Sequence, residues 1–564
     1  MGSAALLVPI AAPALRKPWS RVLVPLLCLG LILTVAFSPG FLEADEIGHF
    51  VMSRDAFHEP RYCVDIWGRP ACTILYAIGA PAGITGSRLI SAMVTLLVCW
   101  GTALLAARVL PQSETPSFFE RHRTAWIWML LFAQPFFLLN SATVMTEMLL
   151  ALFWVWGAVF VTQKRMLLAS LFIGLGGLAR PEGFFAIAAW PAFLWLLNEL
   201  GLVRVGWRKI LLATFLAGLP VLLWFIAGVL IMHSWMWVRD DWPWSVKSQY
   251  GASLSRFFFS LFIAAHGLWL PVVVAVPSLV SALLLRRRFG LAAVLLVLPV
   301  VCFVLLHGVL GGLGLFGSLA MPRYFICIAP LIAILAYWGC QLMTRWVSVR
   351  VLGAVLLPAG CFLGLEMALG WRFGPDAMLR FLYWAVPLLA ALGFVICWKA
   401  EQCFSEKLMA ALTVVLVAVP LVTVVARKNL PIPEPDDAKY IDAAAKALPA
   451  LMPHEQWAER LVAFHPYVRY AMDVPPDVNY RSVRPGYMEN APLGTVVLSD
   501  SGLWESEGGP QDEDFLAWGY ELDEDIQAHI DAAIPGADQA NPWHVQVHIW
   551  VKTHEASTPA GPAR

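Results

Sequence analysis

The feature that most constrains this chain is its succession of long apolar runs. A helix that crosses the hydrocarbon core of a bilayer needs roughly 20 mostly apolar residues, and on that rule the sequence offers about thirteen candidates. Only 14% of residues are charged, whereas soluble domains carry about 25%, so a soluble enzyme, a disordered chain and a fibrous repeat are excluded. We expect a multi-pass α-helical membrane protein. The candidate spans lie near 21–38, 86–109, 124–141, 146–162, 166–179, 183–198, 209–232, 257–284, 289–309, 324–343, 350–369, 381–398 and 408–426.

The distribution of Lys and Arg predicts the orientation, because positively charged loops stay in the cytoplasm. With a cytoplasmic N-terminus, the cytoplasmic side receives 18 basic residues against 12 on the other side. An odd number of spans then places the C-terminal segment outside. The chain ends without an endoplasmic-reticulum retention tetrapeptide, which favours a bacterial plasma (inner) membrane.

Charge divides the chain into two parts. Residues 1–427 carry 30 basic and 17 acidic residues, whereas 428–564 carry 9 and 22. The sequence has no clustered basic face for nucleic acid, so the split favours a transmembrane domain, 1–427, and an acidic extracytoplasmic domain, 428–564. A proline-rich linker, 431–435, joins them. Beyond it we expect a helix at 436–450 and short strands at 461–464, 495–499 and 545–551, which together predict a small α/β domain.

The first outer loop contains the adjacent carboxylates Asp45 and Glu46, followed by His49. Paired acids just beyond a span suit a general base or a bound cation, and on a helix His49 lies one turn from both. All three could therefore converge on one ligand, including a divalent metal. The alternative is an acidic helix start favoured by the helix dipole.

Two further clusters stand at predicted span ends. Arg180 and Glu182 flank Pro181, where an arginine could donate to a phosphate, or where the two side chains could simply form an ion pair inside a turn. Arg323 and Tyr324 follow a glycine-rich stretch, which suits a phosphate or pyrophosphate, or anchors a helix at the lipid headgroups.

The outer loop 233–256 mixes tryptophans with Asp240, Asp241 and Lys247. Aromatic rings beside carboxylates suit a sugar, whose C–H faces stack while its hydroxyls find acceptors. The same composition is typical of an interfacial aromatic belt.

The order of these elements resembles the GT-C superfamily of integral-membrane glycosyltransferases, which includes protein O-mannosyltransferases and the lipid A aminoarabinose transferase. The resemblance lies in Asp45-Glu46 after a first span, then Gly68-Arg69-Pro70 and 86–92, then LARPEG at 178–183 and PRYFICIAP at 322–330. The chain departs from the commonest opening, which has Lys-Pro where Arg69-Pro70 stands.

The resemblance implies a hexosyl- or mannosyl-type enzyme of the cell envelope that moves a sugar from a polyprenyl-phosphate carrier to an acceptor on the outer face, in a single inverting displacement. It assigns Asp45 and Glu46 to catalysis. The acceptor could be a protein, a lipid or a glycan, and a metal held by Asp45, Glu46 or His49 stays open. A transporter or flippase for a lipid-linked or anionic substrate is the alternative. The expected donor-phosphate ligands are Arg180, Arg323, Arg69 and Tyr324, and the expected substrate-binding residues are His49, Glu182, Asp240, Asp241 and Lys247.

Overall fold

The computed structural model describes most of the first 345 residues and parts of the C-terminal segment. The described ranges are 18–110, 116–240, 290–315, 322–345, 430–434, 436–456, 460–463, 465–472, 488–500, 510–524 and 547–555, with isolated positions between 252 and 278 and between 407 and 418. Of the predicted spans, 350–369 and 381–398 lie outside these residues, as do most of 257–284 and 408–426. Within the described ranges, the structure is helical apart from one small sheet.

The chain forms two compact units, each built from segments that are distant in sequence. Unit 1 comprises 1–33, 91–142 and 146–427, and unit 2 comprises 34–90, 143–145 and 428–564. The two units therefore differ from the predicted domains 1–427 and 428–564 in being interleaved along the chain. Unit 2 also takes in 34–90, so the first loop and the C-terminal segment belong to one body.

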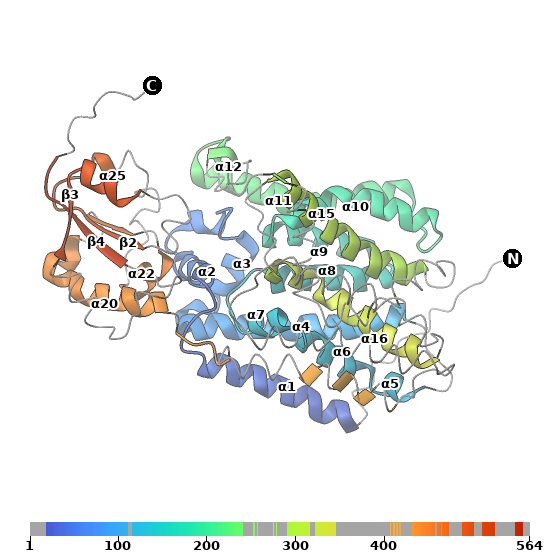
Figure 1. Ribbon diagram of the computed structural model, residues 1–564. Helices are drawn as coiled ribbons and strands as arrows, with labels where there is room; N and C mark the ends of the chain where they lie inside the picture. The colour runs from blue at the N-terminus through green and yellow to red at the C-terminus, as the bar shows by residue number, and fades with distance from the viewer. Residues whose placement is uncertain are drawn as a thin grey trace. The chain divides into compact units, whose positions relative to one another are not determined.

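Unit 1 is a bundle of apolar helices, in which α8, α9, α10 and α11 lie side by side (Figure 1). Among the described residues, four helices are long and apolar enough to cross a membrane: Ala80–Val109, Trp207–Met232, Gly290–Leu313 and Arg323–Leu342. The predicted span 124–141 is broken in two, because Pro135 begins a new helix. The elements are α5 (Phe118–Arg121), α6 (Arg123–Phe132), α7 (Pro135–Asn140), α8 (Glu147–Thr162), α9 (Met166–Ala179), α10 (Glu182–Glu199), α11 (Trp207–Met232), α12 (Trp237–Asp240), the π-helical η3 (Ala293–Val297), α15 (Leu298–Leu313), the 3-10 helix η4 (Pro322–Ile328) and α16 (Ala329–Arg345).

The short apolar segments at 166–179 and 183–198 form a helical hairpin, α9 and α10. Trp190 Nε1 donates to Ser170 Oγ at 2.8 Å, and these two residues stand equally far from the turn at Arg180, so the helices run antiparallel. A Cβ on Gly183 would come within 2.3 Å of the backbone of Gly176. This close approach requires glycine and holds the turn in place.

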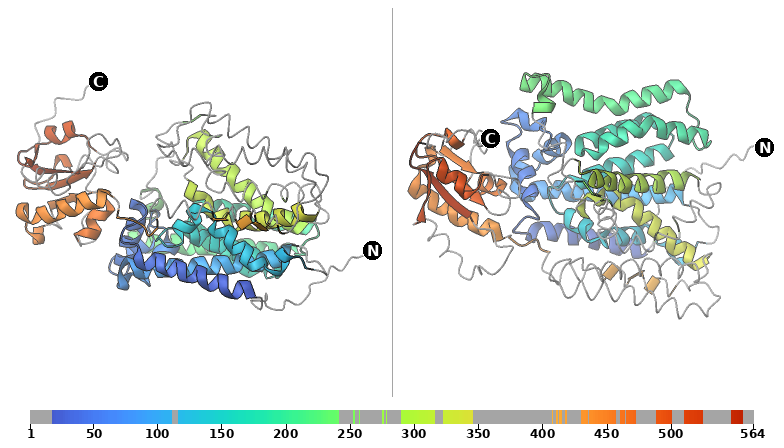
Figure 2. Two further views of the ribbon diagram at one scale, coloured as in Figure 1. Left: turned by 60° about the horizontal axis from the view of Figure 1, so that its bottom comes forward. Right: turned by 45° about the horizontal axis from the view of Figure 1, so that its top comes forward.

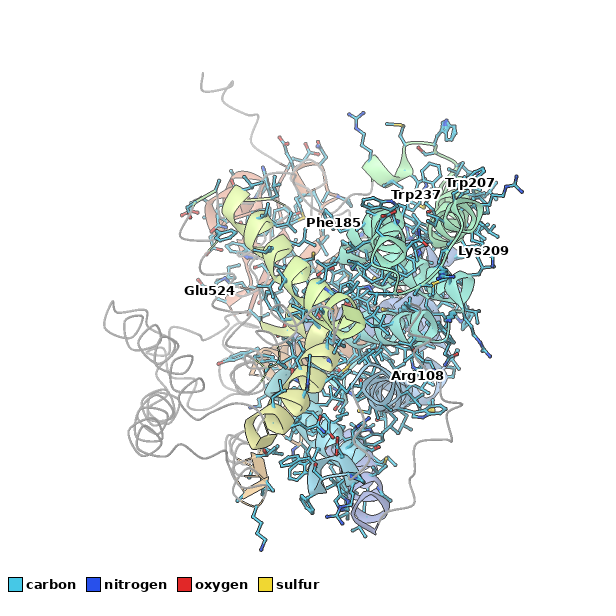
Figure 3. All side chains as sticks on the ribbon, turned by 90° about the vertical axis from the view of Figure 1, so that its right-hand side faces the viewer. Arg108, Phe185, Trp207, Lys209, Trp237 and Glu524 are labelled. Carbon is cyan, nitrogen blue, oxygen red and sulfur yellow. The ribbon has the colours of Figure 1, made fainter. Side chains whose placement is uncertain are left out.

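The outer surface of α11 is apolar. Leu211, Leu223 and Leu230 are 59%, 57% and 68% exposed, which suits contact with lipid chains. At the end of this helix Trp237 folds back and is buried, filling the space that a side chain on Gly228 would occupy (Figure 3).

Unit 2 combines the first loop with a four-stranded sheet. The strand order is β1-β2-β4-β3, with β1 parallel to β2 and the other pairs antiparallel (Figure 2). The helix expected at 436–450 and strands expected at 461–464, 495–499 and 545–551 are found close to those positions. The elements are α2 (Ala44–Asp55), η1 (Pro60–Cys63), α3 (Pro70–Ala77), η2 (Ala80–Ala82), α20 (Asp436–Leu451), η5 (His454–Gln456), β1 (Leu461–Ala463), α22 (Pro466–Ala471), β2 (Val496–Asp500), α25 (Asp512–Ala517), β3 (Tyr520–Leu522) and β4 (Val547–Lys552), while α1 (Pro18–Phe37) and α4 (Gly83–Val109) have residues in both units.

The sheet encloses its own small core. Val462, Val497, Phe515, Tyr520 and Trp550 are buried together, and Phe515 stacks on Trp550 with ring centroids 5.1 Å apart. The register of the strands produces this arrangement: Val462 is paired with Val497 and Val497 with Trp550, so the three side chains lie on one face of the sheet.

Candidate active site

The first turn of α2 carries the two predicted catalytic acids in different environments. Glu46 is fully buried, and its Oε1 lies 2.8 Å from Nε of Arg88, which is buried as well. Glu46 also accepts hydrogen bonds from two backbone amides, Leu42 N at 2.7 Å and Val144 N at 3.1 Å. Both oxygens of this carboxylate are therefore occupied by protein donors.

Arg88 ties the start of the loop to helix α4. Besides Glu46, its guanidinium donates to the carbonyl oxygens of Ser38 at 3.0 Å and Gly40 at 2.5 Å. A buried charge is stable only when it is paired and hydrogen-bonded, and Arg88 meets both conditions. These hydrogen bonds fix the segment that leads into α2. Asp45, the acid next to Glu46 on this helix, is partly exposed.

His49 faces a different group. Its ring stacks on Trp67, with centroids 4.6 Å apart and planes inclined by 17°. Gly48 makes room for this tryptophan, since a Cβ there would lie 2.5 Å from the Trp67 ring. Asp45, Glu46 and His49 thus do not converge as one set of ligands, because Glu46 is held by Arg88 and His49 by Trp67. No group of three His, Cys, Asp or Glu side chains that could hold a metal occurs within the described ranges.

Arg69 stands at the start of α3 with a backbone φ of 60°, a conformation that side-chain-bearing residues seldom adopt. Its Nη1 donates to the carbonyl oxygen of Ile66, three residues earlier. The side chain is half-buried. This local bond orients the guanidinium within the first loop.

In unit 1, Arg180 is the centre of a buried polar network at the turn between α9 and α10. Its Nη1 lies 2.6 Å from Glu147 Oε1 and donates to Thr146 Oγ1 at 2.9 Å. Its Nη2 lies 2.9 Å from Glu182 Oε1, and Nε is bonded to the same carboxylate at 3.2 Å. All three guanidinium nitrogens are therefore engaged. The ion pair with Glu182 that the sequence allowed is present, and a phosphate as partner of Arg180 stays a prediction.

Arg323 and Tyr324 join this network from η4. Arg323 Nε lies 3.8 Å from Glu147 Oε1, so the two arginines share one carboxylate. The guanidinium carbons of Arg180 and Arg323 lie 4.8 and 5.6 Å from the centroid of the Tyr324 ring. Such distances allow cation–π attraction. Three of the four residues predicted to bind a phosphate, Arg180, Arg323 and Tyr324, are thus neighbours.

His307 of α15 completes the cluster. It is 3% exposed, its Nε2 lies 3.5 Å from Glu182 Oε1, and its ring packs against Phe303 and Phe325. Neither ring nitrogen makes a hydrogen bond within the part of the chain that the structure describes. Among the described residues of this network, the two arginines balance the charges of Glu147 and Glu182.

The structure describes the predicted outer loop 233–256 only in part. The backbone of Asp240 ends α12, while Asp241 and Lys247 lie outside the described residues.

Comparison with known proteins rests on structure. No protein-family model matches the chain, and no curated protein matches it either. Two solved structures of ArnT from Cupriavidus metallidurans are similar over most of the chain. The apo form has a TM-score of 0.57 and 14% identity, covering 86% of this chain and 94% of that one. The form bound to undecaprenyl phosphate has a TM-score of 0.56 and 14% identity, covering 96% and 99%.

The chain has the GT-C fold. The GT-C likeness, together with the apolar helices, makes it a multi-pass helical membrane protein. The fold is the one that the resemblance in Asp45-Glu46, LARPEG and PRYFICIAP predicted.

Within the GT-C fold, three buried charged or polar residues escaped assignment from the sequence: Arg88, His307 and Glu147. Each interrupts or begins an apolar run, and an ionisable residue in such a run is a functional candidate by default. By that signal the sequence alone would mark all three residues as candidates. Their partners could not be read from the chain, because Arg88 and Glu46 are separated by 42 positions.

Proposed function

We propose that this protein is a glycosyltransferase that moves a sugar from a polyprenyl-phosphate-linked donor to an acceptor on the outer face of the membrane. The observation that carries the proposal is the GT-C fold, shared over most of the chain with a protein whose structure was solved with undecaprenyl phosphate bound. The chemistry of the described residues supports it.

Asp45 is the proposed base. In the reaction its carboxylate takes the proton of the acceptor hydroxyl, the acceptor oxygen forms a bond to the anomeric carbon, and the bond from that carbon to the phosphate oxygen breaks. The oxygen leaves with the bonding electrons, so the configuration inverts and no sugar–enzyme intermediate forms. Asp45 suits this task because it is partly exposed on a helix whose next residue, Glu46, is fixed by Arg88. Glu46 acts by positioning Asp45.

Arg180, Arg323, Tyr324 and Arg69 are the proposed ligands of the departing phosphate, which cationic donors stabilise as its charge develops. In the buried network around Arg180, Glu147 and Glu182 compete with that phosphate, since their carboxylate oxygens lie 2.6 and 2.9 Å from the Arg180 guanidinium. An incoming phosphate would have to replace one carboxylate as the partner of a guanidinium. The proposal therefore includes an exchange of partners when the donor binds.

The fold supports a membrane enzyme, and we place it in the plasma membrane. The apolar runs of the sequence favour about thirteen spans, and the distribution of Lys and Arg favours a cytoplasmic N-terminus and an extracytoplasmic C-terminal segment. A hexosyl donor of mannosyl type is proposed, with a protein, lipid or glycan acceptor. A divalent metal at Asp45 would need a ligand set other than the one formed with Glu46 and His49. The proposed substrate-binding residues are His49, Glu182, Asp240, Asp241 and Lys247.

The test is transfer of a radiolabelled sugar from polyprenyl phosphate in membranes that contain the wild type or Asp45→Asn. If Asp45 is the base, the variant loses about 10²–10⁴-fold of the rate, the usual contribution of general base catalysis. Glu43→Gln is the matched control, because Glu43 is an exposed acid of the same loop whose side chain makes no helix-capping bond. Wild-type transfer by Asp45→Asn would refute the role of Asp45.

The alternative is a transporter or flippase, which the buried charges at the break between α9 and α10 would also suit. The same membranes separate the two. A wild type that transfers no sugar from any polyprenyl-phosphate donor, yet moves the lipid-linked sugar between leaflets of a vesicle, would favour transport.

A further inference from the structure

The C-terminal segment contacts the helix that carries Asp45. Helix α22 packs on α2, although they are separated by about 400 positions in the sequence. Arg469 of α22 is 4% exposed, and its Nη2 lies 3.5 Å from Asp55 Oδ2 and 3.1 Å from the hydroxyl oxygen of Tyr62. Asp55 is the last residue of α2 and is itself buried. One side chain of the C-terminal segment thus holds the far end of the helix.

Asp55 has a second cation. Its Oδ1 lies 2.8 Å from Nε of Arg54 and its Oδ2 lies 3.4 Å from Nη2 of the same guanidinium, so Oδ2 is shared by Arg54 and Arg469. Arg54 belongs to α2 itself, so of these two cations only Arg469 joins Asp55 to another helix. The guanidinium of Arg469 also lies 5.7 Å from the centroid of the Tyr62 ring.

Aromatic side chains of α22 make further contacts along α2. Tyr467 packs on Phe41, just before the helix, with ring centroids 5.0 Å apart, and Tyr470 meets Phe50 edge to face at 5.8 Å. Together with Arg469, these side chains reach the start, the middle and the end of the helix. Such coverage restrains the tilt of α2 as well as its position.

The linker that precedes α20 binds the other end of the same loop. Ile432 N donates to Ser38 Oγ at 2.9 Å, and Gly40 N donates to Ile432 O at 3.1 Å. Gly40 must be glycine, because a Cβ there would lie 1.8 Å from the carbonyl oxygen of Pro433. The C-terminal segment therefore touches both the approach to Asp45 and the far end of its helix.

We propose that Arg469 is a positioning residue for Asp45, so that the C-terminal segment contributes to catalysis by holding the helix that carries the base. This rests on the proposed function. Helix α2 is a rigid rod of 12 residues with Asp45 in its first turn and Asp55 at its end, so releasing Asp55 allows the rod to tilt. A misplacement of about 1 Å at a reacting group can cost about 10²-fold in rate.

The test compares purified, full-length Arg469→Met, Arg469→Lys, Asp55→Asn and the double variant R469M/D55N in sugar transfer. We expect Arg469→Met to lower kcat by at least about tenfold while the KM for the lipid donor changes less than about twofold. Arg469→Lys should recover part of kcat, and the double variant should be no slower than Arg469→Met alone. Arg460→Met, an arginine of the same unit that lies beside Gly494, is the control.

Hydrogen exchange of residues 44–55 in the same proteins gives a readout that does not depend on catalysis. We expect faster exchange in Arg469→Met and wild-type exchange in Arg460→Met. A wild-type kcat in Arg469→Met, or a loss seen only in the KM for the donor, would overturn the proposal. If the wild type transfers no sugar at all, the proposed function fails, and unchanged exchange in Arg469→Met would then show separately that Arg469 does not hold α2.

Discussion

Replacing Arg88 with methionine tests whether the Glu46–Arg88 pair fixes the catalytic loop. Methionine keeps much of the apolar stem and removes the charge. The change leaves Glu46 as a buried carboxylate with two amide donors and deprives the carbonyls of Ser38 and Gly40 of their shared donor. Removing one partner of a buried ion pair costs about 3–5 kcal/mol, so we expect Arg88→Met to be destabilised by that amount.

The double variant R88M/E46Q decides between a structural pair and two independent roles. Glutamine retains an acceptor for a backbone amide, and with both charges gone no unpaired charge stays buried. We therefore expect the double variant to be destabilised by no more than Arg88→Met alone, instead of by the roughly 6–10 kcal/mol that independent effects would sum to. Denaturant titration of the purified protein in detergent measures the three free energies. Additive costs, or an Arg88→Met within about 1 kcal/mol of wild type, would refute the reasoning.

Two further outcomes follow from the bundle of unit 1. Gly183→Ala should destabilise the protein by several kcal/mol, because its Cβ would lie 2.3 Å from the Gly176 backbone. Gly218→Ala is the control and should be neutral, because no atom lies within 4 Å of a Cβ at that position. Thermal unfolding in detergent compares the two variants. Ser170→Ala leaves Trp190 Nε1 without its acceptor and should lower the free energy of unfolding by about 1–3 kcal/mol, measured as a lower denaturation midpoint. In the Ser170→Ala background, Trp190→Phe should cause little further loss from this hydrogen bond, because the bond is already absent. Equal midpoints in Ser170→Ala and wild type would contradict this expectation.

The helices could be predicted from the sequence because hydrophobic burial in a bilayer depends on local composition. The apolar runs at 146–162, 166–179 and 209–232 correspond closely to α8, α9 and α11. The break at Pro135 shows the limit of that reasoning, since a window average does not register one missing amide hydrogen. Composition indicates that a segment is apolar, and a single residue decides whether it is one helix or two.

The acids were located from the sequence, but their different surroundings were not. Asp45 and Glu46 are adjacent and chemically alike, and the resemblance assigned both to catalysis. The structure distinguishes them because Glu46 contacts Arg88 and the amide of Val144, groups that come from distant segments. His49 stacks on Trp67, and the three residues form no group that could hold a metal within the described ranges. Side-chain partners are a tertiary property, and no periodicity encodes them.

The interleaving of segments in unit 2 has a consequence for assembly. Asp55 and Arg469 are separated by 414 positions, so the contact that holds the end of α2 can form only after almost the whole chain has been synthesised. Closing so long a loop adds little further free energy per residue, because the entropic cost grows only with the logarithm of its length. The long sequence separation therefore delays the formation of this contact more than it lowers the free energy of unfolding. A chain interrupted before α22 would retain Asp45 and the Glu46–Arg88 pair while lacking the groups that hold the rest of the helix. The proposed activity of the first loop would therefore depend on the prior synthesis of α22.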